Sequence, residues 1–171
     1  EMEMEMEMEM KIEMELVICR APKASWEVIF GALKASWGHR FASKRLLAIG
    51  FEALNLNTTG TRNTAVGNQA LEKNTTGSDN TACGRMALWS NTTGSENTGV
   101  GYYALVNNTD GTENTAVGFE CLQLNTTGDY NTAIGHDALE NVSTGSYNTG
   151  MGRDAGRNDS ETIGKNSEIF W

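Results

Sequence analysis

The feature that most constrains the fold of this chain is a tandem repeat, in which the pattern that starts at Asn57 starts again at Asn74 and at Asn91. Six units follow one another without a gap from Asn57 to Asn158, and the fifth reads NTTGDYNTAIGHDALEN. A half unit, AIGFEALNL, precedes them at 48–56, and a shortened unit, ETIGKNS, follows them at 161–167. A short, fixed period indicates a fold in which each unit is one structural turn that stacks on its neighbours.

The columns of the repeat favour a β-solenoid over a helical repeat. Helical repeats need about 33 residues or more per unit, whereas this unit is shorter and carries two invariant glycines that mark backbone corners. Another column holds only Ala or Gly and therefore has no room for a larger side chain. The predicted fold class is mainly β: a parallel β-solenoid of about six to seven 17-residue coils, with an N-terminal extended strand and an amphipathic cap helix. The glycine columns are Gly60, Gly77, Gly94, Gly111, Gly128, Gly145 and Gly67, Gly84, Gly101, Gly118, Gly135, Gly152.

Asparagine and threonine columns run through all six units. Identical polar side chains stacked in register can hydrogen-bond along the stacking axis, as amide ladders do in cross-β structures. The sequence therefore predicts an asparagine ladder at Asn63, Asn80, Asn97, Asn114, Asn131 and Asn148.

The core motif NTAVGxxAL resembles the coils of YadA-like trimeric autotransporter adhesin heads. The longer unit NTTGxxNTAVGxxAL is similar to repeats of phage tail fibres and bacterial surface filaments. The resemblance covers roughly residues 46–167, although the head repeat is shorter than the unit of this chain. It implies that Thr64 and Val66 point into the coil and that Ala65 faces a neighbouring subunit.

Three segments are expected: a strand at 1–16, a basic segment at 17–45 and the β-solenoid repeat domain at 46–171. The first segment, EMEMEMEMEMKIEMEL, alternates with the period of a β-strand. Its apolar side would suit addition to the sheet of another subunit, by β-augmentation. A strip that merely folds back on its own chain is the alternative. The apolar residues of this assembly strand are Met2, Met4, Met6, Met8, Met10, Ile12, Met14 and Leu16.

The basic segment contains a predicted amphipathic helix. Its apolar residues share one face at positions i, i+4, i+7 and i+11, which suits a cap on the first coil better than a helix lying on a membrane surface. The two aromatic residues of the C-terminal SEIFW could cap the last coil or fill a pocket on the next subunit. The cap helix residues are Trp26, Phe30, Leu33 and Trp37.

Charge and hydropathy restrict the partners. The net charge of −9 divides into −6 for 1–16, +5 for 17–45 and −8 for 46–171, which argues against nucleic acid because phosphate binding needs a basic face. No apolar run is long enough to predict a transmembrane segment. We expect the protein to bind copies of itself, outside the cell or at its surface.

No catalytic, cofactor or metal site is predicted. The two histidines, His39 and His136, lie in different regions, and His136 with Asp137 is interpreted as solvated surface polarity. Cys83 and Cys121 replace small apolar residues and are interpreted as small hydrophobes. The chain is therefore not expected to be an enzyme.

Glycosylation is a candidate modification, because the sequon N-x-[ST] recurs about once per coil. It is also a by-product of copying one NTT motif, although it shifts to Asn107 and Asn141 where the motif drifts. Each glycan would then project from one edge of the solenoid. The candidate residues are Asn57, Asn74, Asn91, Asn107, Asn125, Asn141 and Asn158.

The predicted function is that of a structural subunit of an extracellular self-assembling filament, linked by strand exchange and solenoid stacking. A trimeric adhesin or tail-fibre head that binds a surface ligand is the close alternative. An ice-binding solenoid is an alternative of another class. The sequence argues against ice binding, because Ala65 and Val66 follow Thr64. The strand therefore has no second threonine column separated from the first by one residue.

Overall fold

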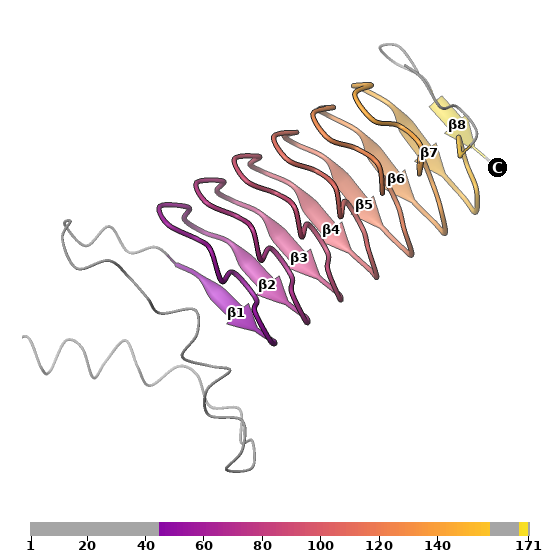
Figure 1. Ribbon diagram of the computed structural model, residues 1–171. Helices are drawn as coiled ribbons and strands as arrows, with labels where there is room; N and C mark the ends of the chain where they lie inside the picture. The colour runs from indigo at the N-terminus through magenta and orange to yellow at the C-terminus, as the bar shows by residue number, and fades with distance from the viewer. Residues whose placement is uncertain (1–44, 158–167, 171) are drawn as a thin grey trace, which may run out of the picture.

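A computed structural model describes residues 45–157 and 168–170 of the chain. These residues contain eight short strands and no helix. The predicted assembly strand at 1–16 and the predicted cap helix around Trp26 to Trp37 lie outside the described residues. The strands are β1 (Leu47–Ile49), β2 (Thr64–Val66), β3 (Thr81–Cys83), β4 (Thr98–Val100), β5 (Thr115–Val117), β6 (Thr132–Ile134), β7 (Thr149–Met151) and β8 (Glu168–Phe170) (Figure 1).

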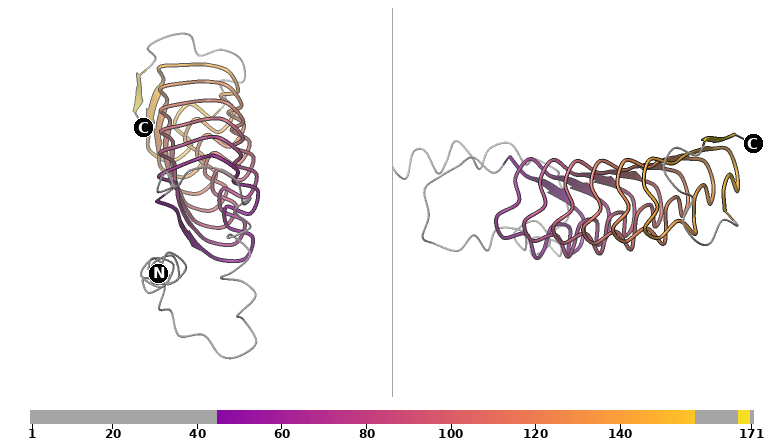
Figure 2. Two further views of the ribbon diagram at one scale, coloured as in Figure 1. Left: turned by 90° about the vertical axis from the view of Figure 1, so that its left-hand side faces the viewer. Right: turned by 90° about the horizontal axis from the view of Figure 1, so that it is seen from above.

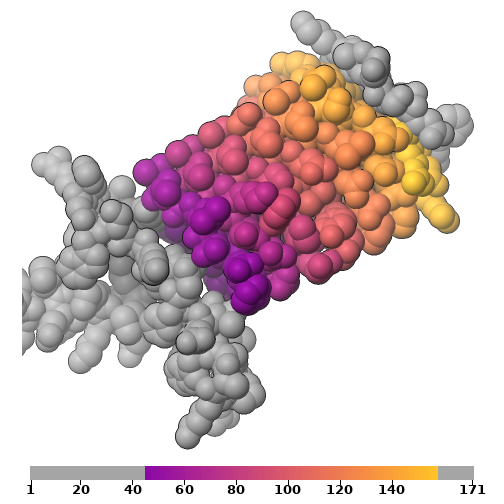
Figure 3. Space-filling view, viewed as in Figure 1, coloured from indigo at the N-terminus to yellow at the C-terminus, as the bar shows by residue number. Residues whose placement is uncertain are grey.

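The strands form one parallel sheet in chain order, from β1 to β8. Leu47 pairs with Thr64, and from there each threonine pairs with the threonine one repeat period further along, as far as Thr149. The coils therefore follow one another along a single axis (Figure 2), and each contributes a transverse band of the surface (Figure 3). This confirms the predicted parallel β-solenoid of about six to seven coils.

Each coil leaves its strand at a glycine in a backbone conformation that other residues rarely adopt. Gly101 has a φ of +137°, and a Cβ at this position would collide with the carbonyl group of Gly118 in the next coil. Two non-glycine residues in the left-handed region follow, Tyr103 at +59° and Leu105 at +54°. Such residues cost about 1–2 kcal/mol each. Stacking offsets this cost, since the turns also hydrogen-bond from coil to coil, as Leu105 N does to Cys121 O at 3.0 Å.

The interior of each coil is narrow. In the first full coil it contains Ala65, Ala70 and Leu71, all fully buried, and the later coils repeat this set with few changes. The orientation that the family resemblance implied for the strand is therefore wrong: Ala65 faces inward, whereas Thr64 and Val66 face outward and are partly exposed.

The small inward residue is dictated by the space inside the coil. Even at Gly99, a Cβ would lie 3.2 Å from Ala104 O and 3.3 Å from Leu88 Cγ. A threonine or valine pointing inward would meet these atoms, so the bulkier residues of the strand must point out.

Two files of asparagine side chains occupy the rest of the interior. In the predicted ladder, the Oδ1 of each residue accepts the backbone N–H of the next, as Asn97 does from Asn114 at 3.0 Å, and Asn114 Nδ2 donates to Gly128 O at 2.7 Å. This confirms the ladder, which we call the second asparagine file. The first asparagine file consists of Asn57, Asn74, Asn91, Asn108 and Asn125, linked from Nδ2 to Oδ1 at 2.7–2.9 Å.

The C-terminal coil is longer than the others. Thr149 pairs with Glu168, whereas the repeat period would place its partner at Asn166. The last strand is thus β8, within the terminal SEIFW, and not part of the shortened unit predicted at 161–167, which lies outside the described residues. The C-terminal segment extends the sheet of its own chain.

Two glycines in the same coil provide a test of this architecture. Gly101→Ala should lower the free energy of unfolding by about 3 kcal/mol, because it combines a forbidden φ with a backbone clash. Gly99→Ala should change it by less than about 1 kcal/mol, since alanine fills this column in other coils and reduces the entropy of the unfolded chain. Urea unfolding followed by circular dichroism measures both. Equal effects of the two substitutions would contradict the inward orientation of the central strand residue.

Candidate interaction surface

The outward side of the sheet is the most distinctive surface of the described residues. Side chains alternate along a strand, so the first and third residues of each strand point away from the coil. Over β1 to β7 this gives fourteen side chains, two from each of seven strands, and none of them is charged. We call this surface the sheet face. Its two files are Leu47, Thr64, Thr81, Thr98, Thr115, Thr132, Thr149 and Ile49, Val66, Cys83, Val100, Val117, Ile134, Met151.

The threonine hydroxyls of the sheet face differ from those elsewhere in the repeat. In the loops, Thr75 Oγ1 donates to Thr92 O at 2.9 Å, and Thr92 Oγ1 donates to Thr109 O at 3.1 Å. The six threonines of the sheet face make no side-chain hydrogen bond to any described residue. Their hydroxyl groups are therefore available to water or to a partner, beside a parallel file of aliphatic side chains.

Charged and aromatic side chains border the sheet face. On one side, Arg62 forms a bidentate pair with Asp79, with distances of 2.5 and 2.7 Å. On the other side, Tyr102, Phe119 and His136 stack from coil to coil, with ring centroids 5.3 and 4.8 Å apart. An uncharged centre with a polar and aromatic border is the usual composition of a protein interface.

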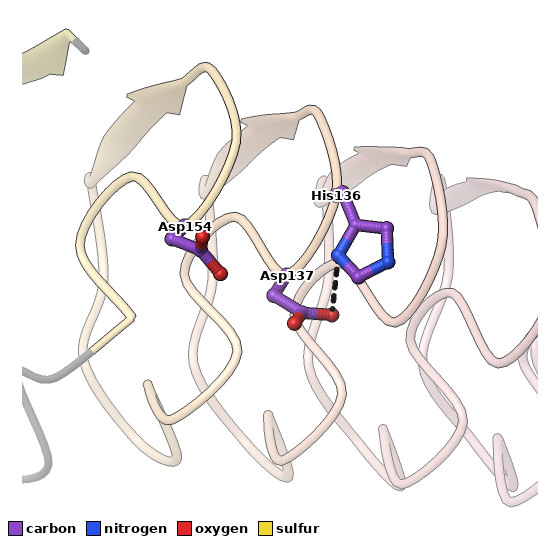
Figure 4. A group of neighbouring side chains, drawn as sticks. All are labelled: His136, Asp137 and Asp154. Carbon is purple, nitrogen blue, oxygen red and sulfur yellow. Dashed lines mark ion pairs between the residues drawn. The ribbon is translucent and has the colours of Figure 1, made fainter.

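His136 also belongs to a cluster of titratable side chains near the C-terminal end of the solenoid. Atoms of His136, Asp137 and Asp154 lie within 4.8 Å of one another, and His136 Nδ1 is 3.1 Å from Asp137 Oδ1 (Figure 4). Histidine and carboxylate oxygen are common metal ligands. Asp137 is buried, in contrast to the solvated role predicted for it.

Arg157 supplies the cation that this cluster needs. Its Nη1 lies 2.9 Å from both Asp137 Oδ2 and Asp154 Oδ1, and its Nε lies 2.6 Å from Glu140 Oε2. Burial and the carboxylates of Asp137 and Glu140 raise the pKa of nearby Glu120. With a guanidinium group among its carboxylates, the cluster is an ion-pair network that ties two coils together.

Three of the sequon asparagines are placed where a glycan does not fit. Asn74, Asn91 and Asn125 are fully buried in the first asparagine file. Asn57 and Asn107 are partly exposed, but their Nδ2 atoms donate to backbone carbonyls at 3.0 and 2.9 Å. Asn141 likewise donates to Arg157 O. Glycosylation at Asn74, Asn91 and Asn125 therefore does not agree with the fold. At the partly exposed Asn57, Asn107 and Asn141 it stays a prediction, and Asn158 lies outside the described residues.

The structure also explains why the sequon shifts where the motif drifts. Asn107, the last residue of the third unit, begins the shifted sequon, but it is Asn108, the first residue of the fourth unit, that continues the first asparagine file. In the sixth unit buried Val142 takes the position of the file, and Asn125 Oδ1 is left without a hydrogen-bond donor. The recurrence of asparagine in this column is therefore explained by the hydrogen bonds of the first asparagine file and not by the sequon.

The two described cysteines have different surroundings. Cys83 is exposed within the sheet face, whereas Cys121 is buried and its Sγ lies 2.7 Å from Gly135 O. Burial raises the pKa of the Cys121 thiol. Cys121 therefore packs as a small hydrophobe, as predicted, whereas the same interpretation is wrong for Cys83, which is an exposed thiol on the sheet face.

No family model, no curated protein and no solved structure matches this chain. The resemblance to adhesin heads and tail-fibre repeats thus rests on the repeat motif, and the structure supports it only as far as the solenoid fold. Among the described residues there is no helix with the length and hydrophobicity needed to span a membrane.

Neighbouring asparagines test the role of the first file. Asn108→Val should lower the free energy of unfolding by about 2 kcal/mol, because Asn91 Oδ1 and Asn125 Nδ2 each lose a buried partner. Asn107→Ser removes the sequon and should cost less than about 1 kcal/mol, since its side chain is partly exposed. Chemical unfolding of both variants gives the comparison. A larger loss for Asn107→Ser would show that the sequon position carries the structural role.

Proposed function

We propose that this protein is a structural, non-catalytic subunit that associates with further copies of itself through the sheet face. The observation that carries the proposal is the uncharged face of β1 to β7, in a chain with 13 basic and 22 acidic residues. Protein interfaces are depleted of charged residues at their core and polar at their rim, which is the pattern of this face.

The narrow interior supports the same conclusion. Each coil buries little more than one leucine and two small residues, so a single solenoid has a small hydrophobic core for its length. The aliphatic file of the sheet face holds apolar side chains that the coil itself cannot bury. Covering this file with the same file of another copy would add the missing apolar burial.

The geometry favours side-by-side association. The two files run along the solenoid axis, so copies with parallel axes can bring their whole lengths into contact. A closed trimer, like the heads that the repeat resembles, and a filament linked by strand exchange of residues 1–16 are both compatible with such contact. An extracellular location belongs to the same proposal.

A charge placed in the sheet face should prevent association. Val117→Arg puts a guanidinium group in the middle of the aliphatic file, where an interface would have to bury it without a partner. We expect the apparent dissociation constant to rise at least about tenfold. Light scattering coupled to gel filtration measures the mass of the species over a range of concentrations.

The matched control is Thr127→Arg, which adds the same charge at an exposed loop position before β6. It should leave the mass unchanged. The labelling rate of Cys83 provides a second readout, because association would cover this thiol. A wild-type protein that stays monomeric at high concentration, with Cys83 fully reactive, would refute the proposal.

Ice binding is a second candidate, which one observation now favours. Because Ala65 points inward, Thr64 and Val66 lie on the same face, which removes one part of the objection drawn from the sequence, although the second file of this face still contains no threonine. A flat array of free hydroxyls and methyl groups, repeating about every 4.8 Å along the axis, could order water as a lattice does. Self-association and ice binding would use the same face and exclude each other.

Thermal hysteresis decides this alternative. If the sheet face binds ice, the wild-type protein will lower the freezing point below the melting point, and Thr98→Tyr will abolish most of the effect because a bulky ring breaks the flat surface. Thr127→Tyr should have no effect. Wild-type protein without hysteresis at millimolar concentration would eliminate the candidate.

A further inference from the structure

The first described coil departs from the rest of the repeat toward apolar residues. Leu46 stands where the next coil has buried Asn63, and Leu47 stands where β2 to β7 all have threonine. Of the twelve large hydrophobic residues that are exposed in the described part of the chain, five fall within eleven positions here, and β1 has only β2 as a strand partner in this part. The terminal unit of a solenoid is normally polar on its outer side. We call these five residues the first-coil patch: Leu46, Leu47, Ile49, Phe51 and Leu56.

The opposite end of the solenoid is a poor partner for this patch. Among the described residues, the coil before β8 contains Arg153, Asp154 and Arg157, and Arg157 is paired with carboxylates of two coils. Stacking that end of a second copy on the leucines of the first-coil patch would bury these charges against apolar groups, which is costly. The occupant of the patch should instead be apolar on one side and basic on the other.

We propose that residues 22–37 of the same chain dock on the first-coil patch and cap the solenoid. In the sequence, Trp26, Phe30, Leu33 and Trp37 share one face of the predicted helix. The segment 17–45 has a charge of +5 and the segment 46–171 a charge of −8, so attraction between them favours the contact. The docking does not rest on the proposed self-association.

Chain connectivity makes docking within one chain favourable. Trp37 precedes Leu46 by nine residues, a linker that reaches about 30 Å when extended. A partner on such a short tether has an effective concentration in the millimolar range. A capped end also blocks strand addition at β1 and covers Leu47 and Ile49, which leaves the sheet face of β2 to β7 as the surface for association.

Limited proteolysis of the full-length protein tests the cap. Trypsin can cleave after Lys23, Lys34 and Arg40, and mass spectrometry follows each cleavage. Docking should protect Lys34 in the wild-type protein. In the double variant Phe51→Ser with Leu56→Ser we expect cleavage there to be about tenfold faster or more, because the patch loses two large apolar contacts.

The repeat itself supplies the matched control. Phe119 and Leu124 occupy the same two columns four coils further on, and both are 40% exposed, compared with 53% for Phe51 and 49% for Leu56. Phe119→Ser with Leu124→Ser should leave cleavage after Lys34 unchanged. Circular dichroism confirms that both double variants keep the solenoid.

A variant on the other side of the contact, Trp26→Ser with Trp37→Ser, should reproduce the faster cleavage. Equal cleavage rates in the wild-type protein and in the Phe51→Ser, Leu56→Ser variant would overturn the proposal. Protection that grows with protein concentration would assign the cap to another copy and would also overturn it. Both results are independent of the light-scattering mass that tests self-association.

Discussion

The structure depends on one constraint: each coil must repeat the backbone of the previous coil in register. Only then does the Oδ1 atom of Asn97 meet the backbone N–H of Asn114, and only then does Gly128 O receive Asn114 Nδ2. A buried amide without partners costs more free energy than a hydrogen bond returns. The hydrogen bonds of the buried asparagine amides therefore fix the repeat period as much as the burial of apolar side chains does.

The same constraint sets the conformations that the coil can use. Glycines at the corners approach the carbonyl of the next coil so closely that any Cβ would collide with it. Left-handed residues such as Leu105 are tolerated because the hydrogen bonds of their turns run to the next coil. Backbone strain that would destabilise a single turn is offset in every coil by hydrogen bonds to the next coil. Other repeat proteins likewise derive their stability from contacts between neighbouring units.

Because each coil is narrow, packing restricts the residues at its interior positions, whereas the residues on its exterior can vary from coil to coil. The loops and the borders of the sheet carry charges, aromatic stacks and the Arg157 network, which differ from coil to coil. The sheet face does not vary in this way, since it is uncharged in all seven strands. The uniformity of this outer face is the observation on which the proposed association rests.

The alternation of three-residue strands shows how far the sequence alone could go. The motif NTAVG predicts that Thr and Val lie on one side of the strand and Ala on the other. It does not predict which side faces the interior of the coil. That depends on how much space the closed coil leaves around Leu71 and Leu88, which is a property of the whole turn. The lack of charge in these two columns could have indicated a distinct surface. The sequence could not show that this surface faces outward from the coil.

The sequence by itself determined the period, the parallel stacking, the glycine corners and the ladder at Asn63 to Asn148, because these follow from identical residues at identical spacing. The tertiary structure alone decided that Ala65 faces inward, that the sequon asparagines are bonded and in part buried, and that the last strand is Glu168–Phe170. The physical reason is that a repeat fixes which residues stack on one another, whereas the volume inside the coil and the ends of the stack fix which of them water can reach.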